Sequence, residues 1–236
     1  MTHTLTLCFD APMQSWGLRS RGVLRDTARE PTKSGVVGLL AAATGVERDD
    51  EPAIAALAAL RLGVRVDREG LLERDYHTTQ NVPTTTGSGH RTVVSERYYL
   101  ADALFLVAIE GPETLLRELA DAVRNPRWPL FFGRRAFVPA RPLFDDGLHD
   151  GSLEQILREH RWLEHRDRAG TTIRDQQQIA LRTVIDCPTG AVGAEPRHDV
   201  PRSFAHGARR FATRTVLVGE VPLTDNMIPA GDTTCS

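Results

Sequence analysis

The chain has 236 residues, of which 41% are hydrophobic and 25% charged, and a formal net charge of −2. This composition is typical of globular proteins, and it allows one large domain or two smaller ones. No apolar run is long enough to cross a bilayer and no signal peptide is recognisable, so a membrane or secreted protein is not expected. Cys8, Cys187 and Cys235 are scattered, which excludes a cysteine metal motif or disulfide framework and favours a cytoplasmic protein.

Basic residues gather in three segments although the whole chain is slightly negative. Residues 11–46 carry five basic side chains against two acidic ones, residues 122–144 carry five arginines and no acid, and residues 196–214 carry five arginines against one aspartate. Such separation of charge favours a basic face that binds a polyanion, for example nucleic acid. For any single segment, solvated surface arginines are the alternative explanation.

Hydrophobic periodicity predicts alternating strands and helices. Strands are expected where polar and apolar residues alternate or where a short apolar run is continuous, and helices where apolar residues recur three and four apart. In chain order these are a strand at 4–9, helices at 32–45 and 49–60, strands at 60–67, 71–76, 92–100 and 103–109, a helix at 112–123, and a last strand at 130–132 or 136–138. Beyond Pro142 a helix at 152–160 and strands at 179–185 and 214–218 are expected.

The segment 31–45 is expected to be a loop that becomes a helix. Thr32 or Ser34 can cap its start, and its final glycine can end it. The first turn contains Lys33, the only lysine of the chain, beside free backbone N–H groups and the positive end of the helix dipole. This turn is therefore a candidate anion site, with a merely capped, solvated helix start as the alternative. The glycine spacing of a nucleotide-binding P-loop is absent.

Two further places are candidates for contacts with RNA. Gln14 and Trp16 follow the first strand, where an amide can read a base and an indole ring can stack on one. Trp16 as an ordinary core residue is the competing explanation. In the turn Gly133-Arg134-Arg135, glycine permits close approach of the backbone, and the two guanidinium groups can face a phosphate.

Residues 77–91 are polar, rich in Gly and Thr, and flanked by strand-like segments. The simplest interpretation is a long β-hairpin with a flexible tip that stands away from the domain and touches a partner. A disordered insertion is the alternative.

Without this arm, the first 141 residues follow the order strand, helix, strand, strand, helix, strand. This βαββαβ order is typical of α+β ferredoxin-like (RRM-like) domains, which include many RNA-binding modules. We therefore expect a ferredoxin-like domain at 1–141, with the hairpin inserted at about 70–100, and a smaller, irregular β-rich part at 142–236.

Four blocks of sequence, in order along the chain, resemble a known protein family. They are PMQSWG at 12–17, PTKSGVVGLL at 31–40, GVERDD at 45–50, and Gly-Arg-Arg at 133–135 with Pro139 behind it. In this order they resemble the CasD-type subunits of the subtype I-E CRISPR complex Cascade, which belong to the RAMP superfamily of RNA-binding proteins. The first two blocks are the specific ones, and the resemblance covers essentially the whole chain.

The resemblance implies a non-catalytic subunit that needs no cofactor and no metal. In this family the subunit caps one end of Cascade, a ribonucleoprotein complex of antiviral defence, and binds the five-prime handle of the CRISPR RNA (crRNA). Its arm, called a thumb, would reach the neighbouring backbone subunit (CasC-type). The large subunit (CasA-type) would dock nearby, and target DNA would be met only through the complex.

The resemblance also assigns RNA contacts to the N-terminal loop, the helix start and the Gly-Arg-Arg turn. These predicted RNA-binding residues are Met13, Gln14, Trp16, Arg19, Arg25, Thr32, Lys33, Ser34, Gly35, Arg134 and Arg135. The thumb tip would comprise residues 77–91 and present His77, Gln80, Asn81, His90 and Arg91.

A metal-independent endoribonuclease is the alternative function. A sibling family in subtype I-C resembles this one in fold and cleaves precursor RNA with a Tyr, a Lys and a His. Such cleavage needs a base, an acid and a cation. Tyr76 with His77, or His90 with Tyr98, would supply the first two, but the only lysine lies at the helix start, so no catalytic residue is assigned. A generic RNA-binding protein outside CRISPR, a third possibility, leaves the arm without a purpose.

Overall fold

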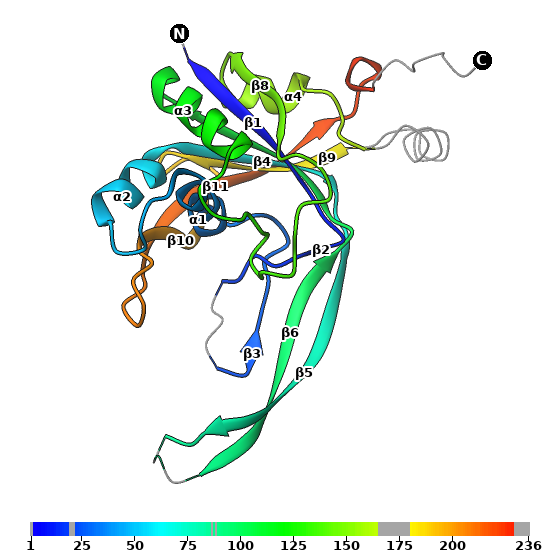
Figure 1. Cartoon of the computed structure of the whole chain (residues 1–236). Helices are drawn as coiled ribbons and strands as arrows, with labels where there is room; N and C mark the ends of the chain where they lie inside the picture. The colour runs from blue at the N-terminus through cyan, green and yellow to red at the C-terminus, as the bar shows by residue number, and fades with distance from the viewer. Residues whose placement is uncertain (1, 19–21, 86, 88, 165–179, 229–236) are drawn as a thin grey trace, which may run out of the picture.

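The computed structural model describes residues 2–18, 22–85, 87, 89–164 and 180–228. Its main element is a seven-stranded sheet of order β10-β11-β9-β4-β7-β1-β8, in which neighbouring strands are antiparallel (Figure 1). Its strands are β1 (His3–Asp10), β4 (Arg61–Arg68), β7 (Leu104–Gly111), β8 (Phe144–Asp150), β9 (Ala180–Cys187), β10 (Glu195–Ser203) and β11 (Arg210–Pro222). The helices are α1 (Lys33–Thr44), α2 (Glu51–Ala59), α3 (Glu113–Arg124), α4 (Leu153–Glu159) and the 3₁₀ helix η1 (Asp225–Met227).

The neighbouring strands β1 and β7 are buried on both faces of the sheet. On one face Leu7 and Phe9 belong to the large core that α1 and α3 share. On the other face Cys8 packs in a smaller core with Leu153 and Leu157 of α4. Burial on both faces explains why β7 is a continuous apolar run rather than an alternating one.

The helix predicted between residues 31 and 45 is confirmed as α1. The Oγ1 of Thr32 accepts a hydrogen bond from the backbone N–H of Gly35 at 3.2 Å, and Gly45 ends the helix with φ of 80°. The strands predicted up to residue 109 and the helices predicted at 49–60, 112–123 and 152–160 are confirmed as well, with small changes of bounds everywhere except in the arm, where the strand predicted at 71–76 continues to residue 83.

The last strand of the first part was predicted in the wrong place. Neither 130–132 nor 136–138 is a strand, and β8 pairs with β1 instead. Phe132 and Phe137 are buried in a tight turn in which each backbone N–H bonds within the loop, Phe132 to Phe137 O and Phe137 to Arg134 O. These side chains are apolar because they pack on the core, Phe132 against Phe9 at 4.8 Å between ring centroids, and not because they alternate along a strand.

Gly133 is required where this loop passes the N-terminal segment. It has φ of 88°, and a Cβ there would collide with the backbone oxygen of Ser15. An alanine at this position would have a strained left-handed backbone, and its Cβ would also be overpacked against Ser15. We therefore expect Gly133→Ala to lower the free energy of unfolding by about 2–4 kcal/mol in chemical denaturation. Gly190→Ala is the matched control, since Gly190 has φ of 89° and open space around its Cβ position. Equal losses in the two variants would contradict the close approach.

The arm is a regular β-hairpin for most of its length. It belongs to a second sheet formed by β2 (Met13–Gln14), β3 (Leu24–Arg25), β5 (Leu71–Pro83) and β6 (His90–Ala101). β5 and β6 pair from Leu71↔Ala101 to Pro83↔His90, and Figure 1 shows them reaching away from the body. The expected flexible tip of 77–91 is therefore too long, because strand pairing continues as far as residues 83 and 90. The alternative of a disordered insertion is wrong for the residues described.

The strands after residue 180 extend the main sheet rather than build a separate one. β9 pairs with β4, so the sheet continues across the boundary predicted at residue 141. The division into parts 1–141 and 142–236 remains a prediction. Overall the chain is a mixed α+β fold with mainly antiparallel sheets. Among the residues described, no helix combines the length and apolarity needed to cross a membrane.

Candidate nucleic-acid interface

The start of α1 is occupied by a carboxylate of the chain itself. Asp199 of β10 accepts a hydrogen bond from the backbone N–H of Lys33 at 2.8 Å. The side chain of Lys33 is only 7% exposed, and its Nζ donates to Asp186 of β9 at 2.7 Å. The groups predicted to bind an external phosphate are thus already used, so the geometry contradicts an open anion site at this turn.

Arg214 of β11 completes this buried network. Its Nε and Nη2 donate to Asp199 at 2.7 and 2.9 Å, and its Nη1 donates to Asp186. Burial by itself would raise the pKa of Asp199, but the bonds from Arg214 and from the N–H of Lys33 outweigh it and lower that pKa below its usual range. Two cations and two carboxylates balance one another here, so Lys33 and Arg214 add no net charge to a basic face.

Gln14 and Trp16 are also interior residues. Gln14 is fully buried, and its Nε2 donates to the carbonyl oxygens of Phe9 and Ala103 at 3.2 and 2.8 Å. Trp16 is 2% exposed and stacks on Phe9 with ring centroids 5.6 Å apart. A ring needs an exposed face to stack on a base, so these positions contradict the base-reading and stacking roles predicted for the two side chains. The alternative, a core tryptophan, is confirmed.

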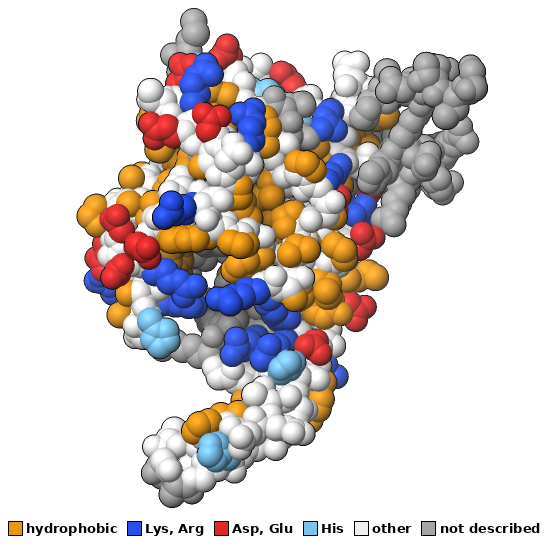
Figure 2. Space-filling model, viewed as in Figure 1, with side chains coloured by type: hydrophobic (Ala, Val, Ile, Leu, Met, Phe, Trp, Pro, Cys, Tyr) orange, Lys and Arg blue, Asp and Glu red, His pale blue; other side chains and the backbone are white. Residues whose placement is uncertain are grey.

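Three arginines meet at the root of the arm, and we call Arg25, Arg97 and Arg134 the arm-base cluster. β3 pairs in parallel with β6, which sets Arg25 beside Arg97. The Nη2 of Arg134 donates to the carbonyl oxygen of Tyr98 at 2.7 Å, which brings this third guanidinium to the same strand. Figure 2 shows Lys and Arg side chains in a band where the body meets the arm.

The arm-base cluster carries more positive than negative charge. Burial lowers the pKa of Arg134, and the nearby positive charges of Arg97 and Arg25 lower it further, whereas Asp75 acts in the opposite direction. A guanidinium remains protonated far above neutral pH. Three mutually repelling cations, one of them partly desolvated, are stabilised when a phosphate binds between them.

Arg97 is the member of the cluster that the sequence did not predict. Its backbone lies in an ordinary strand, and its Nε donates to the Oγ of Ser95 at 3.2 Å. Only the pairing of β6 with β3, whose two residues carry no strong strand signal, brings Arg97 to Arg25.

The remaining predicted RNA contacts lie at different depths. Arg135 is exposed beside the cluster and Met13 is 36% exposed, so both remain predicted contacts. Thr32 is buried as the cap of α1. The side-chain oxygens of Thr32 and Ser34 are 3.3 Å apart. Gly35 lies close to the ring of Trp16, since a Cβ at this position would be 2.8 Å from that ring. Arg19 lies outside the described residues.

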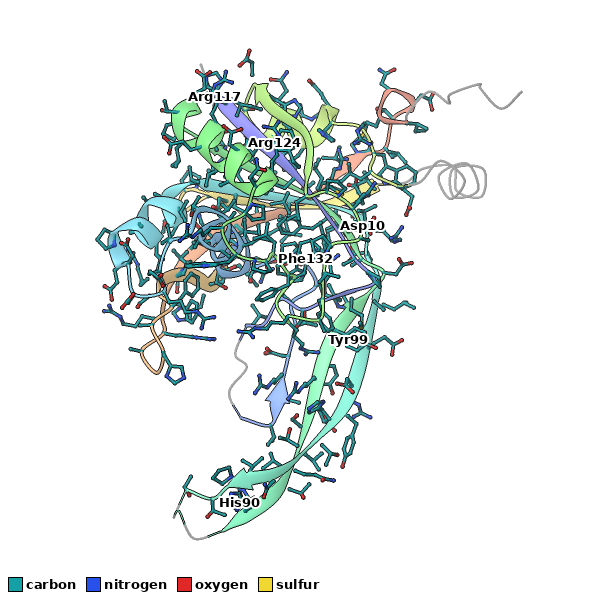
Figure 3. All side chains as sticks on the ribbon, viewed as in Figure 1. Asp10, His90, Tyr99, Arg117, Arg124 and Phe132 are labelled. Carbon is teal, nitrogen blue, oxygen red and sulfur yellow. The ribbon has the colours of Figure 1, made fainter. Side chains whose placement is uncertain are left out.

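The predicted tip residues are spread along the arm. His77 lies in the paired middle of β5 and is half-buried, which corrects its placement at the tip. Gln80 and Asn81 are exposed at an irregularity of β5, where Asn81 has φ of 60°. His90 and Arg91 are exposed at the start of β6, and Figure 3 shows His90 near the far end.

The side-chain pairs that would serve RNA cleavage do not converge. Tyr76 and His77 are neighbours on one strand, so their side chains point to opposite faces. His90 and Tyr98 are eight residues apart on β6, a separation of roughly 26 Å along a strand. Within the parts of the chain that are described, no group of three or more His, Cys, Asp or Glu could hold a metal ion.

Comparisons with known proteins give consistent results. Residues 4–217 match a family described as "CRISPR-associated protein (Cas_Cas5)". The "CRISPR system Cascade subunit CasD" of Escherichia coli (strain K12) is 36% identical over 159 residues, which are 61% of this chain and 70% of that protein. A solved "CRISPR RNA-guided surveillance complex" contains a chain with 33% identity and a TM-score of 0.75, covering 98% of this chain and 95% of the other. Another, "Crystal structure of Cas protein", has 37% identity and a TM-score of 0.71, with coverage of 97% and 98%.

Proposed function

Because the chain belongs to the family of CRISPR-associated proteins described as Cas_Cas5, we propose that it is a non-catalytic Cascade subunit that binds the five-prime handle of the crRNA. The arm-base cluster carries this proposal. Its three arginines come from distant parts of the sequence, and no salt bridge to a carboxylate is seen for them among the residues described. Such a cluster supplies the phosphate contacts that position a single strand.

The proposal includes a ferredoxin-like unit as the body that holds the RNA. Four strands in the order β4-β7-β1-β8, with helices between β1 and β4 and between β7 and β8, support this assignment. In the assembled complex the arm reaches the CasC-type backbone subunit and the CasA-type large subunit docks nearby.

Handle recognition is tested by comparing the affinities of the chain for two RNAs. The purified full chain is mixed with labelled RNA carrying the host's handle and with a scrambled RNA of equal length. We expect tighter binding of the handle, with affinity that falls as salt rises. Equal affinity for the two RNAs would contradict handle recognition.

A separate incubation tests the endoribonuclease alternative. With labelled precursor repeat RNA, the binding-only proposal expects the RNA to remain at full length on a denaturing gel. Specific cleavage that is lost in His77→Ala or His90→Ala would overturn the proposal in favour of the endoribonuclease.

The arm is expected to act in assembly and not in folding. Thr79 and Val93 are paired across the hairpin, so residues 80–92 can be replaced by a two-residue Asn-Gly turn. We expect this variant to keep its melting temperature and its affinity for handle RNA, because the core and the arm-base cluster are untouched. Assembly with the backbone subunit, measured by co-purification, is expected to fall about tenfold. Normal assembly would assign the arm another role.

A further inference from the structure

A cavity of about 620 Å³ lies next to the start of α1, distinct from the arm-base cluster. One wall is formed by Leu18 and residues 27–32, and the other walls come from Glu69 and from strands β9, β10 and β11. Four arginines line it: Arg29, Arg182, Arg197 and Arg214. Its volume is in the range of sites that enclose a small organic molecule or a single nucleotide.

Two of these arginines use their hydrogen-bonding edges within the protein. The Nε and Nη2 of Arg182 donate to Glu69 at 2.7 and 3.0 Å, and its Nη1 donates to Glu30 at 2.9 Å. Arg214 is held in the same way by Asp199 and Asp186. Because the nitrogens of both guanidinium groups already donate to carboxylates, a ligand in the cavity can contact only their flat faces. A nucleobase can stack on the plane of an arginine in this way.

The other two arginines are less engaged. Arg29 is exposed, and Arg197 is partly exposed with one salt bridge, from its Nη2 to Glu195 at 3.0 Å. Both retain donors for a phosphate. Leu18 and Pro31 contribute apolar wall, and the carboxylates of the lining, Glu30, Glu69 and Asp199, are those already bound to Arg182 and Arg214. The cavity therefore combines two neutralised guanidinium groups, an apolar surface and two arginines that keep donors for a phosphate.

One residue of the arm-base cluster and one residue of the cavity lining are close together in the chain. Arg25 belongs to the cluster and Arg29 to the cavity, and four residues span at most about 14 Å. A strand whose phosphates are bound at the cluster can therefore reach the cavity within a few nucleotides.

We propose that this cavity binds one unstacked nucleotide of the single-stranded RNA, with its base against Arg182 and Arg214 and its phosphate on Arg29 and Arg197. This inference rests on the proposed function, because it needs RNA at the arm-base cluster. It adds a site for base identity next to a site that only positions the backbone.

The test combines RNA lacking single bases with a protein variant. A series of handle RNAs is made, each with one abasic nucleotide, and their affinities for the full chain are measured. One position is expected to lose about tenfold when its base is removed. In Arg29→Ala/Arg197→Ala that loss is expected to shrink below about twofold, which is the coupling expected for groups that act on one nucleotide. The matched control is Arg48→Ala/Arg209→Ala, two exposed arginines outside the cavity lining, and it should keep the tenfold loss.

The outcomes separate this inference from the proposed function. If handle RNA binds but every abasic position lowers the affinity by the same factor, the cavity binds no base. The inference then fails while the proposed function stands. It also fails alone if the cavity variant and the control show the same abasic profile. If the wild-type chain does not prefer handle RNA to the scrambled RNA, the proposed function and the inference fail together.

Discussion

Removing the three charges of the arm-base cluster is expected to lower the affinity for handle RNA by about fiftyfold at 0.15 M salt. Each phosphate contact on a single strand contributes about 0.7 to the slope of log affinity against log salt, so the slope should fall by about 2. The variant is Arg25→Ala/Arg97→Ala/Arg134→Gln, in which Gln keeps a donor for the carbonyl oxygen of Tyr98. Fluorescence anisotropy titrations at several salt concentrations measure both quantities.

A charge-matched variant controls for net charge. Arg117→Ala/Arg124→Ala/Arg158→Ala removes three arginines of α3 and α4, and Figure 3 shows Arg117 and Arg124 at the end of the body away from the arm. This variant should change the slope little. Equal loss of affinity in both variants would mean that overall charge, and not the arm-base cluster, attracts the RNA.

The second large effect is on stability and lies in the buried network. Asp199→Asn is expected to lower the free energy of unfolding at neutral pH by about 3 kcal/mol, because it removes the carboxylate that binds two nitrogens of the buried Arg214 and leaves this cation only its bond to Asp186. Asp121→Asn is the control, since Asp121 pairs with Arg124 on the surface with its side chain 78% exposed, and such pairs contribute less than about 1 kcal/mol.

The pH dependence of the same variant follows from the lowered pKa of Asp199. A carboxyl whose pKa is lower in the folded state stabilises the fold above its unfolded pKa, which is about 4, and loses this contribution as the pH falls through the folded pKa. The difference in the free energy of unfolding between wild type and Asp199→Asn should therefore have its largest value at pH 7 and become smaller below about pH 4. A difference that does not change with pH would show that shape, rather than charge, decides the effect.

Local patterns predicted the elements well because each element depends on signals within a few residues. The cap at Thr32, the left-handed glycine at 45 and the apolar period between them specify α1. The continuous apolar run of β7 specifies a strand buried on both faces. The turn at 132–137 was mistaken for a strand because burial of its phenylalanines against the core looks the same in a sequence as burial along a sheet.

The site was predicted less well than the elements. The residue types in a motif do not say whether a side chain points outward. Lys33 has every local feature of a phosphate ligand, yet its partners Asp186 and Asp199 lie more than 150 residues away in the chain. Likewise, Trp16 is a core residue because Phe9 and Phe132 enclose it.

The amino-acid sequence by itself determined the helices, most of the strands, the arm and the segments that are rich in arginine. Only the tertiary structure decided which of those cations are neutralised and which are left to bind an anion. The reason is that charge compensation depends on strand pairing between distant segments. The pairing of β9, β10 and β11 brings aspartates to Lys33 and Arg214, whereas the pairing of β3 with β6 brings Arg25 to Arg97.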